Sequence, residues 1–386
     1  MNIGIVCYAS VGGSGVVGTE LAHALALRGH RVHLISSEVP FRWRHGLPGL
    51  SFERVETPAY PLFREPQYLL ALANTIVRVA CERKLDLVHA HYAVPHATAA
   101  YLADQILASG RDASPAQTVT TLHGTDITLV GSDPSYRRVV AFSIEQSSGV
   151  TAVSESLRRE TVEMLGIRQP IRVIPNFIDT TEFRRSPDPE LKKRLSPDGA
   201  PILMHMSNFR PVKRVEAVYE VFRGVMAQRD AHLVLVGDGP DRLALERRAA
   251  EDGLQERVRF VGEQLNLPAW LSAADVFLLP SAQESFGMAA VEAMGCEVPV
   301  IASRIGGLPE VIVHGETGFL FAPGDVDGMV QQALRLAGDR SLAERIGAAA
   351  CESVHTRYNA DAIVPLYEAF YREVLKAPRK ITPGVI

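Results

Sequence analysis

The sequence predicts an α/β protein with two domains of similar architecture, each a parallel sheet covered by helices on both faces. Short apolar runs rich in β-branched residues alternate with longer segments of helical periodicity along the chain. This rhythm breaks once, in residues 168–201, which contain six prolines and a charge run at 190–194. Because 386 residues exceed the usual length of one domain, we expect an N-terminal domain at 1–170 and a C-terminal domain at 171–359.

The strands of the N-terminal domain are expected where apolar and β-branched residues run without interruption. These runs lie at 3–8, 32–36, 85–91, 118–123 and 150–154. Helices are expected at 18–28 and 67–83, where apolar residues recur near helical spacing. Continuous apolar strands separated by helices are typical of a parallel sheet with both faces buried.

The C-terminal domain repeats this alternation. Its expected strands lie at 202–207, 232–236, 258–261, 276–280, 300–303 and 318–321. Its expected helices lie at 214–229, 240–252, 288–294 and 327–336. A last amphipathic helix at 360–376 has Ile363, Leu366, Phe370 and Val374 on one side. We expect this helix to pack back on the N-terminal domain.

Composition excludes several classes of protein. The chain is 47% hydrophobic and 22% charged with a net charge of -4, so no bulk positive charge favours nucleic acid or an anionic membrane. The most apolar helical stretch, 68–81, is short and interrupted by polar residues. No leader pattern precedes the first strand. The four cysteines form no CxxC pair. We therefore expect a soluble, reduced, cytoplasmic protein without membrane or nucleic-acid partners.

The glycine-rich loop at 12–15 is the first candidate site. In parallel α/β sheets ligands bind beyond the carboxyl ends of the strands, and two such sheets that face each other would form a cleft. Gly13, Ser14 and Gly15 precede or open a helix, where backbone N–H groups bind anions. Residues 13–18 also match GxGxxG, and Glu38 follows the next strand, as in NAD-binding proteins. Because the loop leaves the strand about four residues before the glycines, we favour a substrate loop and keep an NAD-dependent oxidoreductase as an alternative.

Polar residues also follow the later strands of this domain. Tyr92 follows one strand, and His123, Thr125 and Asp126 follow the next. A lone histidine at such a position is usually a core residue, but the neighbouring Thr125 and Asp126 favour a role for His123 in function. We interpret His89, inside its strand, as structural.

In the C-terminal domain, residues 207–214 follow a strand and open a helix. Arg210, Lys213 and Arg214 place three cations within five residues at this helix start. The helix dipole disfavours cations there, so a bound anion is expected, with lysine as a point charge and arginine as a fork. The glycine turns at 237–240 and 306–310 follow other strands.

The most specific feature is the segment 284–292. Ser285, Phe286, Gly287 and Met288 would present backbone N–H groups at a helix N-terminus, a second anion site. Glu284 lies in the preceding loop, whereas Glu292 is expected about two turns into the helix. The two carboxylates would therefore contact different parts of one extended ligand, unless Glu292 faces solvent.

Taken together, these motifs resemble the retaining GT-B glycosyltransferases of family 4, whose fold is two facing Rossmann-like domains with an interdomain cleft. Glu284 and Glu292 match the E-x7-E motif of that family, Lys213 its phosphate-binding lysine, and residues 12–15 its N-domain loop. Residues 7–20, 91–96, 123–128 and 207–214 resemble the subgroup that makes N-acetylglucosaminyl-malate in bacillithiol biosynthesis. The resemblance covers nearly the whole chain.

The resemblance implies UDP-GlcNAc as donor, bound mainly by the C-terminal domain. Glu292 would hold the ribose and Glu284 the sugar hydroxyls, while Lys213, Arg210 and the backbone of 285–288 would hold the diphosphate. The family usually has arginine five residues before the lysine, and here that residue is Asn208. The expected donor-binding residues are Gly15, Asn208, Arg210, Lys213, Glu284, Ser285, Phe286, Gly287, Met288 and Glu292.

The resemblance implies L-malate as acceptor, bound by the N-terminal domain, and catalytic roles for His123, Lys213 and Glu284. The expected acceptor-binding residues are Gly13, Ser14, Gly15, Tyr92, Thr125 and Asp126. Cations for the malate carboxylates are left open among Arg42, Arg44, Arg137 and Arg138. It further implies no cofactor, no metal and a homodimer. A family 4 enzyme with an inositol phosphate, lipid or glycan acceptor is the nearest alternative, and a UDP-sugar epimerase or a non-catalytic sugar-nucleotide-binding protein is a weaker one.

Overall fold

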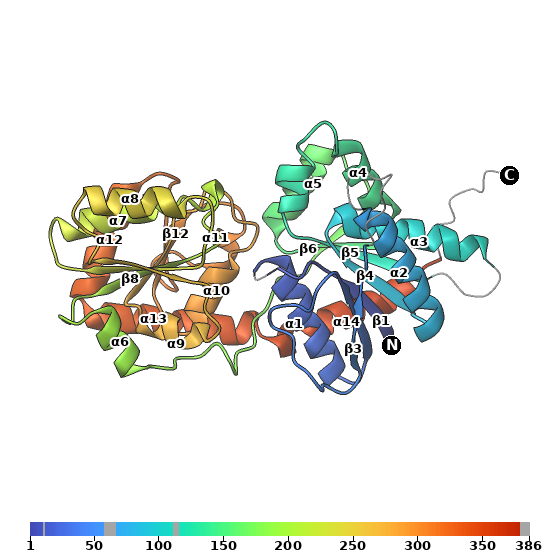
Figure 1. The fold of residues 1–386 in the computed structure, drawn as a ribbon, viewed down its shortest axis with the longest axis horizontal. Helices are drawn as coiled ribbons and strands as arrows, with labels where there is room; N and C mark the ends of the chain where they lie inside the picture. The colour runs from blue at the N-terminus through green and yellow to red at the C-terminus, as the bar shows by residue number, and fades with distance from the viewer. Residues whose placement is uncertain (11, 58–66, 111–115, 379–386) are drawn as a thin grey trace. The chain divides into compact units, whose positions relative to one another are not determined.

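The structure is a computed structural model that describes residues 1–10, 12–57, 67–110 and 116–378. The chain forms two compact units, one made of Met1–Asn176 with Asp361–Ile386 and the other of Phe177–Ala360 (Figure 1). Each unit is an α/β layer structure with a single parallel sheet, which confirms the predicted fold class. Among the described residues, no helix has both the length and the apolar character needed to cross a membrane.

The first unit contains a parallel sheet of seven strands in the order β3-β2-β1-β4-β5-β6-β7. The strands are β1 (Asn2–Val6), β2 (Arg31–Ser36), β3 (Leu50–Arg54), β4 (Leu87–His91), β5 (Gln117–Leu122), β6 (Gly149–Ala152) and β7 (Ile171–Val173). The order reverses between β1 and β4, where parallel α/β sheets bind ligands at the carboxyl ends of the strands.

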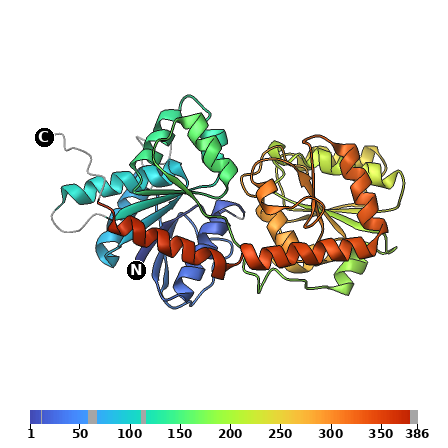
Figure 2. The same cartoon turned by 180° about the vertical axis from the view of Figure 1, so that it is seen from behind.

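Helices cover both faces of this sheet. They are α1 (Ser14–Leu27), α2 (Tyr68–Arg83), α3 (Thr98–Ser109), α4 (Arg137–Gln146), α5 (Glu155–Leu165) and α14 (Ala360–Lys376), with short helical segments η1 (Ala93–Ala97) and η2 (Asp126–Val130). Apolar residues of α2 and α3 pack on β1, β2 and β4 as one buried cluster. Figure 2 shows α14 lying across the sheet.

The second unit has a parallel sheet of six strands in the order β10-β9-β8-β11-β12-β13, which reverses between β8 and β11. Its strands are β8 (Ile202–Met206), β9 (His232–Val236), β10 (Val258–Gly262), β11 (Val276–Leu279), β12 (Val300–Ser303) and β13 (Phe319–Phe321). Its helices are α6 (Pro189–Leu195), α7 (Val215–Met226), α8 (Arg242–Glu251), α9 (Leu267–Ala273), α10 (Met288–Gly295), α11 (Leu308–Val311), α12 (Val326–Gly338) and α13 (Arg340–Arg357), with the short segment η3 (Pro211–Lys213).

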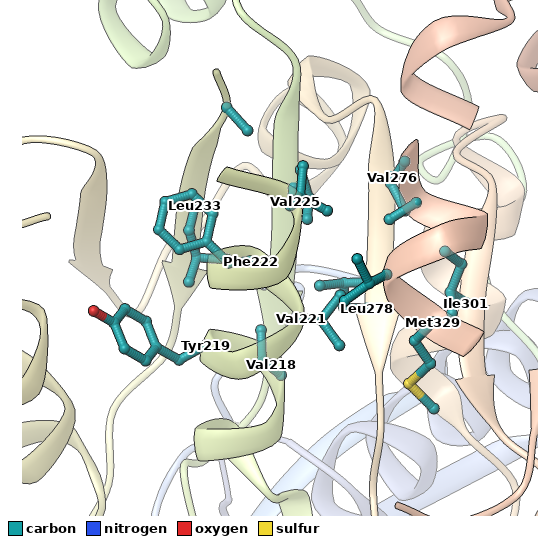
Figure 3. Close-up of a cluster of buried hydrophobic side chains, with 14 of the residues drawn as sticks. Val218, Tyr219, Val221, Phe222, Val225, Leu233, Val276, Leu278, Ile301 and Met329 are labelled. Carbon is teal, nitrogen blue, oxygen red and sulfur yellow. The ribbon is translucent and has the colours of Figure 1, made fainter. Parts of the chain in front are cut away.

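The core of the second unit lies mainly under α7 and α12 (Figure 3). Val218, Phe222 and Val225 recur at helical spacing on α7 and are fully buried against Leu233 of β9 and Leu278 of β11. α7, α8 and α12 cover one face of the sheet, and α6, α9, α10 and α13 cover the other (Figure 1). Because both faces are closed, only the strand ends remain for ligands.

Several sequence expectations need correction. β3 and β7 were not predicted, and the charge run at 190–194 belongs to α6, whose N-terminus is capped by Asp188. α1 begins at Ser14 and not near residue 18. Gly15 and Gly18 lie inside this helix and let it approach the residues that follow β1. A Cβ on Gly18 would lie 2.9 Å from the Cβ of Cys7. On α14, Leu366 is 44% exposed, so it does not belong to the buried face.

α14 docks on the sheet of the first unit through a buried carboxylate and a buried aromatic face. Glu368, nearly buried, accepts hydrogen bonds from Arg28 Nε at 3.0 Å and lies 2.9 Å from Nε2 of His30. The Tyr371 hydroxyl lies 2.7 Å from Nδ1 of His89. Gly149 has no side chain because a Cβ there would lie 2.6 Å from Val374. These contacts give His89 a structural role.

The Glu368 carboxylate should stabilise the first unit in a pH-dependent way. Hydrogen bonds from Arg28, with a smaller contribution from His30, lower the pKa of Glu368 to about 2, below the value of about 4.3 expected in the unfolded chain. A lowered pKa stabilises the fold above the unfolded value, and this stabilisation is lost as the pH falls from about 5 towards 2. We expect Glu368→Gln to cost about 2 kcal/mol at pH 7 and progressively less below pH 5.

The measurement is urea unfolding followed by the fluorescence of Trp43, which belongs to this unit, in a Trp270→Phe background. Glu373→Gln is the matched control, because Glu373 on the same helix pairs with Arg172 with both side chains about half exposed. Exposed pairs contribute at most about 1 kcal/mol. Equal losses for the two variants, or a loss that does not depend on pH, would contradict the role assigned to Glu368.

Candidate functional site

The candidate residues of both units lie at the carboxyl ends of strands on either side of the point where strand order reverses. In the second unit, residues 207–213 follow β8 and residues 280–288 follow β11. In the first unit, the glycine loop follows β1, Tyr92 follows β4 and His123 follows β5.

Lys213 and Glu284 form the centre of the site in the second unit. Nζ of Lys213 lies 2.6 Å from Oε1 of Glu284, and the side chains are 20% and 9% exposed. The hydroxyl of Ser281 donates to the same oxygen at 3.0 Å. The sequence separation of the ion pair is 71 residues, so the contact depends on the adjacent positions of β8 and β11. The ammonium group of Lys213 can therefore leave Glu284 to bind a ligand anion, or it can contact both at once.

The loop after β8 is fixed by close backbone packing. Phe209 is fully buried with a φ of 35°, which leaves its neighbours Asn208 and Arg210 exposed. A Cβ on Gly237 would lie 2.0 Å from the carbonyl oxygen of Ser207, and one on Gly239 would lie 2.1 Å from that of Asn208. The predicted turn at 237–240 thus supports the loop that carries the cations.

The loop after β11 is held in the same way by the second predicted glycine turn. The N–H of Gly307 donates to the carbonyl of Glu284 at 2.9 Å, and a Cβ on Gly306 would lie 1.8 Å from that oxygen. Gly287 caps α10 with a φ of 96°, and the first intrahelical bonds are those from Ala290 and Val291. The preceding N–H groups of the helix, including that of Met288, are therefore free of intrahelical partners and suit an anion.

The structure places Glu292 closer to the start of its helix than expected and shows that the Phe286 side chain is buried. Glu292 is 5% exposed, so it does not face solvent, and it lies little more than one turn into α10 because the helix begins at Met288. The Phe286 side chain is buried against Tyr358 with ring centroids 5.4 Å apart. Only the backbone of Phe286 can therefore contact a ligand.

In the first unit, Gly13, Ser14 and Gly15 form the start of α1. Gly13 is the N-cap with a φ of 63°, which favours glycine, and it is exposed. A Cβ on Gly15 would lie 2.5 Å from the carbonyl oxygen of Tyr8, so Gly15 allows the helix to approach the strand end. Ser14 is buried, which leaves the backbone of this turn as the polar surface.

His123, directly after β5, is stacked on His91, the last residue of β4. Nδ1 of His91 and Nε2 of His123 are 2.9 Å apart, and the Tyr92 ring lies 5.4 Å from that of His123. Burial lowers the pKa of His123 to about 3, so the imidazole is neutral at physiological pH. A neutral His123 can donate or accept a hydrogen bond but cannot supply positive charge. Tyr92 itself adopts a φ of 99°, which is rare for a residue with a side chain.

Asp126 holds these two strand ends together. Its carboxylate accepts hydrogen bonds from the N–H groups of Ala93 at 3.1 Å, His123 at 3.2 Å and Gly124 at 2.9 Å. Burial raises the pKa of Asp126 to about 6, while these three N–H groups oppose the rise. Thr125, on the same turn, is partly exposed. The geometry gives Asp126 the role of positioning His123.

The structure also shows polar residues that sequence reasoning did not assign. His91, Ser281 and His205 join the candidate residues at short range. His91 and His205 could have been found from the sequence, because each is a histidine within an otherwise buried strand. Apolar residues would pack more easily at such positions. Of the arginines considered for the acceptor, Arg44 lies 3.5 Å from Glu20, and Arg137 donates to the carbonyl of Met164.

Within the described ranges, no group of three or more histidine, cysteine, aspartate or glutamate side chains is arranged to hold a metal ion. Asp325 and Asp327 form an Asp-x-Asp sequence, but Asp325 caps α12 by accepting from the N–H of Gly328 at 2.9 Å.

Comparisons with known proteins agree with this arrangement. Residues 11–182 match the glycosyltransferase family 4 domain, and residues 188–353 match the domain of the group 1 glycosyl transferases. The chain is 45% identical over 377 residues to the N-acetyl-alpha-D-glucosaminyl L-malate synthase of Bacillus anthracis, which covers 97% of this chain and 98% of the relative. It is 28% identical to a GDP-mannose-dependent phosphatidylinositol monomannoside mannosyltransferase of Mycobacterium tuberculosis, over 90% of this chain and 91% of the relative.

Solved structures show the same fold at lower identity. The sucrose-phosphate synthase of Thermosynechococcus elongatus superposes with a TM-score of 0.81 at 23% identity, covering 98% of this chain and all of that one. Anabaena HepE, solved with UDP and glucose, superposes with a TM-score of 0.79 at 22% identity, covering 96% of this chain and 99% of that one. With a relative of 45% identity along nearly its whole length and both domains matched, the chain belongs to the group 1 and family 4 glycosyltransferases, as its motifs predict.

Proposed function

We propose that the protein transfers GlcNAc from UDP-GlcNAc to the hydroxyl of L-malate with retention of configuration, releasing UDP, as the first step of bacillithiol biosynthesis. The observation that carries this proposal is the identity of 45% over 97% of the chain with a GlcNAc-malate synthase. That identity and coverage support a common donor and acceptor for the two proteins.

The donor site of the proposal lies in the second unit. Lys213, Arg210 and the N–H groups at the start of α10 would bind the diphosphate, since they combine positive charge with unpaired backbone donors. Glu284 would bind sugar hydroxyls and Glu292 the ribose. Support comes from the side-chain burial of both glutamates, which holds their carboxylates in place, and from the Lys213–Glu284 contact.

The acceptor site of the proposal lies in the first unit. Gly13, Ser14 and Gly15 would present N–H groups to a malate carboxylate, and Tyr92 and Thr125 would contact the rest of the acceptor. His123, which burial keeps neutral, would accept or donate a hydrogen bond near the reacting carbon. Asp126 would act by positioning His123.

The chemistry of the proposal is a direct displacement on the face that UDP leaves. The malate hydroxyl attacks the anomeric carbon as the bond to the diphosphate oxygen breaks, and the leaving phosphate accepts the hydroxyl proton. Lys213 stabilises the negative charge that develops on the diphosphate, which is electrostatic preorganisation and requires no nucleophilic residue. Metal independence and a homodimer, which the resemblance implies, and a cytoplasmic location, which the composition favours, complete the proposal.

The first test is mass spectrometry of a reaction that contains the purified protein, UDP-GlcNAc and L-malate without added metal. We expect a product with the mass of GlcNAc-malate and an equal amount of UDP. UDP release without this product would refute malate as acceptor and direct the search to inositol phosphate, lipid or glycan acceptors. No UDP release from a folded protein would refute UDP-GlcNAc as donor.

The second test removes the central charges of the donor site. Lys213→Ala and Glu284→Ala should each lower kcat/KM about 100-fold to 1000-fold, because each removes a preorganised interaction with the reacting substrate. Steady-state kinetics of UDP release measures the effect, and circular dichroism checks the fold.

Lys192→Ala is the matched control for the lysine variant. Lys192 of α6, in the same unit, forms a 2.7 Å ion pair with Asp275, and its side chain is 46% exposed. Asp275 directly precedes β11, so this pair lies at the amino end of that strand, whereas Glu284 follows its carboxyl end. Replacement of Lys192 should leave kcat/KM within about twofold. Full activity in Lys213→Ala or Glu284→Ala would remove that residue from the mechanism.

A further inference from the structure

We infer that His205 is a positioning residue for the donor site, and that it acts through Ser207 to set the path of the loop that carries Lys213. This inference rests on the proposed function, because it concerns how the donor diphosphate is held. His205 belongs to β8 and neither reaches the substrate side nor contacts Lys213 by a hydrogen bond among the described residues.

The position of His205 is unusual for a core residue. It is fully buried in β8. The residues around it are apolar, both in its own strand (Leu203, Met204) and in the paired strand β9 (Leu233, Leu235). Burying an imidazole costs free energy unless both nitrogens have partners. An apolar side chain would fill this space equally well. The hydrogen bonds that the imidazole makes therefore explain why histidine occupies the position.

The partners fix the tautomer of the ring. Nδ1 lies 2.8 Å from the carbonyl oxygen of Leu278, and a carbonyl can only accept, so Nδ1 carries the hydrogen. Nε2 of the neutral ring must then accept, and the Ser207 hydroxyl donates to it at 2.8 Å. Burial lowers the pKa of His205 to about 4, which keeps this neutral form throughout the physiological range.

Ser207 links His205 to the loop at 207–213, which carries Arg210 and Lys213. With its proton directed at His205, the Ser207 oxygen accepts the N–H of Phe209 at 3.2 Å. Phe209 is the residue with a φ of 35°, a conformation that a residue with a side chain adopts only when its surroundings enforce it. From this point the chain turns into η3, which ends at Lys213.

His205 also connects the two loops that form the ion pair. Its Leu278 partner lies in β11, and the loop after β11 carries Ser281 and Glu284. β8 and β11 are the neighbouring strands at which the strand order reverses. One buried ring therefore joins the strand that leads to Lys213 and the strand that leads to Glu284, whose side chains meet at 2.6 Å.

The test compares His205→Phe, His205→Gln and Ser207→Ala with the wild type. The phenylalanine variant keeps an aromatic ring between Phe209 and Phe277 but has neither hydrogen bond. We expect the Kd for UDP, measured by calorimetry, and the KM for UDP-GlcNAc to rise about tenfold. The KM for L-malate should stay within twofold, because the acceptor residues lie in the other unit. His205→Gln, which retains an amide able to accept from Ser207, should recover part of the affinity.

His232→Phe is the matched control for loss of stability. His232 is a buried histidine at the start of β9, at the opposite end of the sheet from the loops, with Asp198 as its partner at 2.9 Å. It should lower the Tm without changing the Kd for UDP. If His205→Phe and Ser207→Ala bind UDP as the wild type does, or if His232→Phe weakens UDP binding equally, the inference is wrong.

Hydrogen–deuterium exchange separates this inference from the proposed function. We expect His205→Phe to speed exchange in peptides that cover 207–213 while peptides that cover 232–236 keep the wild-type rate. Unchanged exchange at 207–213 would overturn the inference whether or not the wild type binds UDP. A wild type that does not bind UDP, combined with faster exchange in the variant, would refute the donor assignment and leave the positioning of the loop supported.

Discussion

The constraint on which the structure depends is the parallel pairing of strands with both sheet faces covered. Parallel strands need crossover helices, and these helices bury both faces, so polar chemistry can be placed only where strands end. At the point where strand order reverses, adjacent loops diverge to opposite faces and leave room for a ligand. β1 and β4 create this arrangement in the first unit, and β8 and β11 create it in the second. Most candidate residues follow these strands, and His123, Thr125 and Asp126 follow β5, the neighbour of β4.

Close backbone packing then gives the strand-end loops their shape. Gly237, Gly239, Gly306 and Gly307 each bring their α-carbon so near to a neighbouring carbonyl that no side chain fits. These main-chain contacts hold the loops with Lys213 and Glu284, and the side-chain hydrogen bonds of His205 and Ser207 add to them in the first loop. Rigid loops of this kind lower the entropy that a ligand must lose to be bound in one geometry. Asp126 achieves the same for the first unit with three hydrogen bonds from backbone N–H groups.

Much of the fold could be predicted because its signals are local. Continuous apolar strands and glycine-rich strand ends are visible in short windows of sequence, and the long motifs around Lys213 and Glu284 identified the family. β7 was missed because three residues at a sheet edge carry little pattern, and Leu366 was misplaced because helical periodicity alone does not say which neighbouring element covers a face. The 2.6 Å contact between Lys213 and Glu284 and the hydrogen bond of His205 to the carbonyl of Leu278 join residues 71 and 73 positions apart. Such contacts follow from strand order, which the alternation of strands and helices does not specify.

The final helix has a consequence for the order in which the protein is made. The first unit consists of Met1–Asn176 and the segment that begins at Asp361, so its last layer is translated after the whole second unit. Until α14 leaves the ribosome, the sheet surface around His89 and Gly149 lacks Tyr371, Phe370 and Val374. A nascent chain can complete the second unit while the first still exposes an apolar face, although N-terminal domains usually fold first. Residues translated after the second unit thus complete the domain that was begun first, and chains that terminate before residue 361 would leave it open to association with other exposed surfaces.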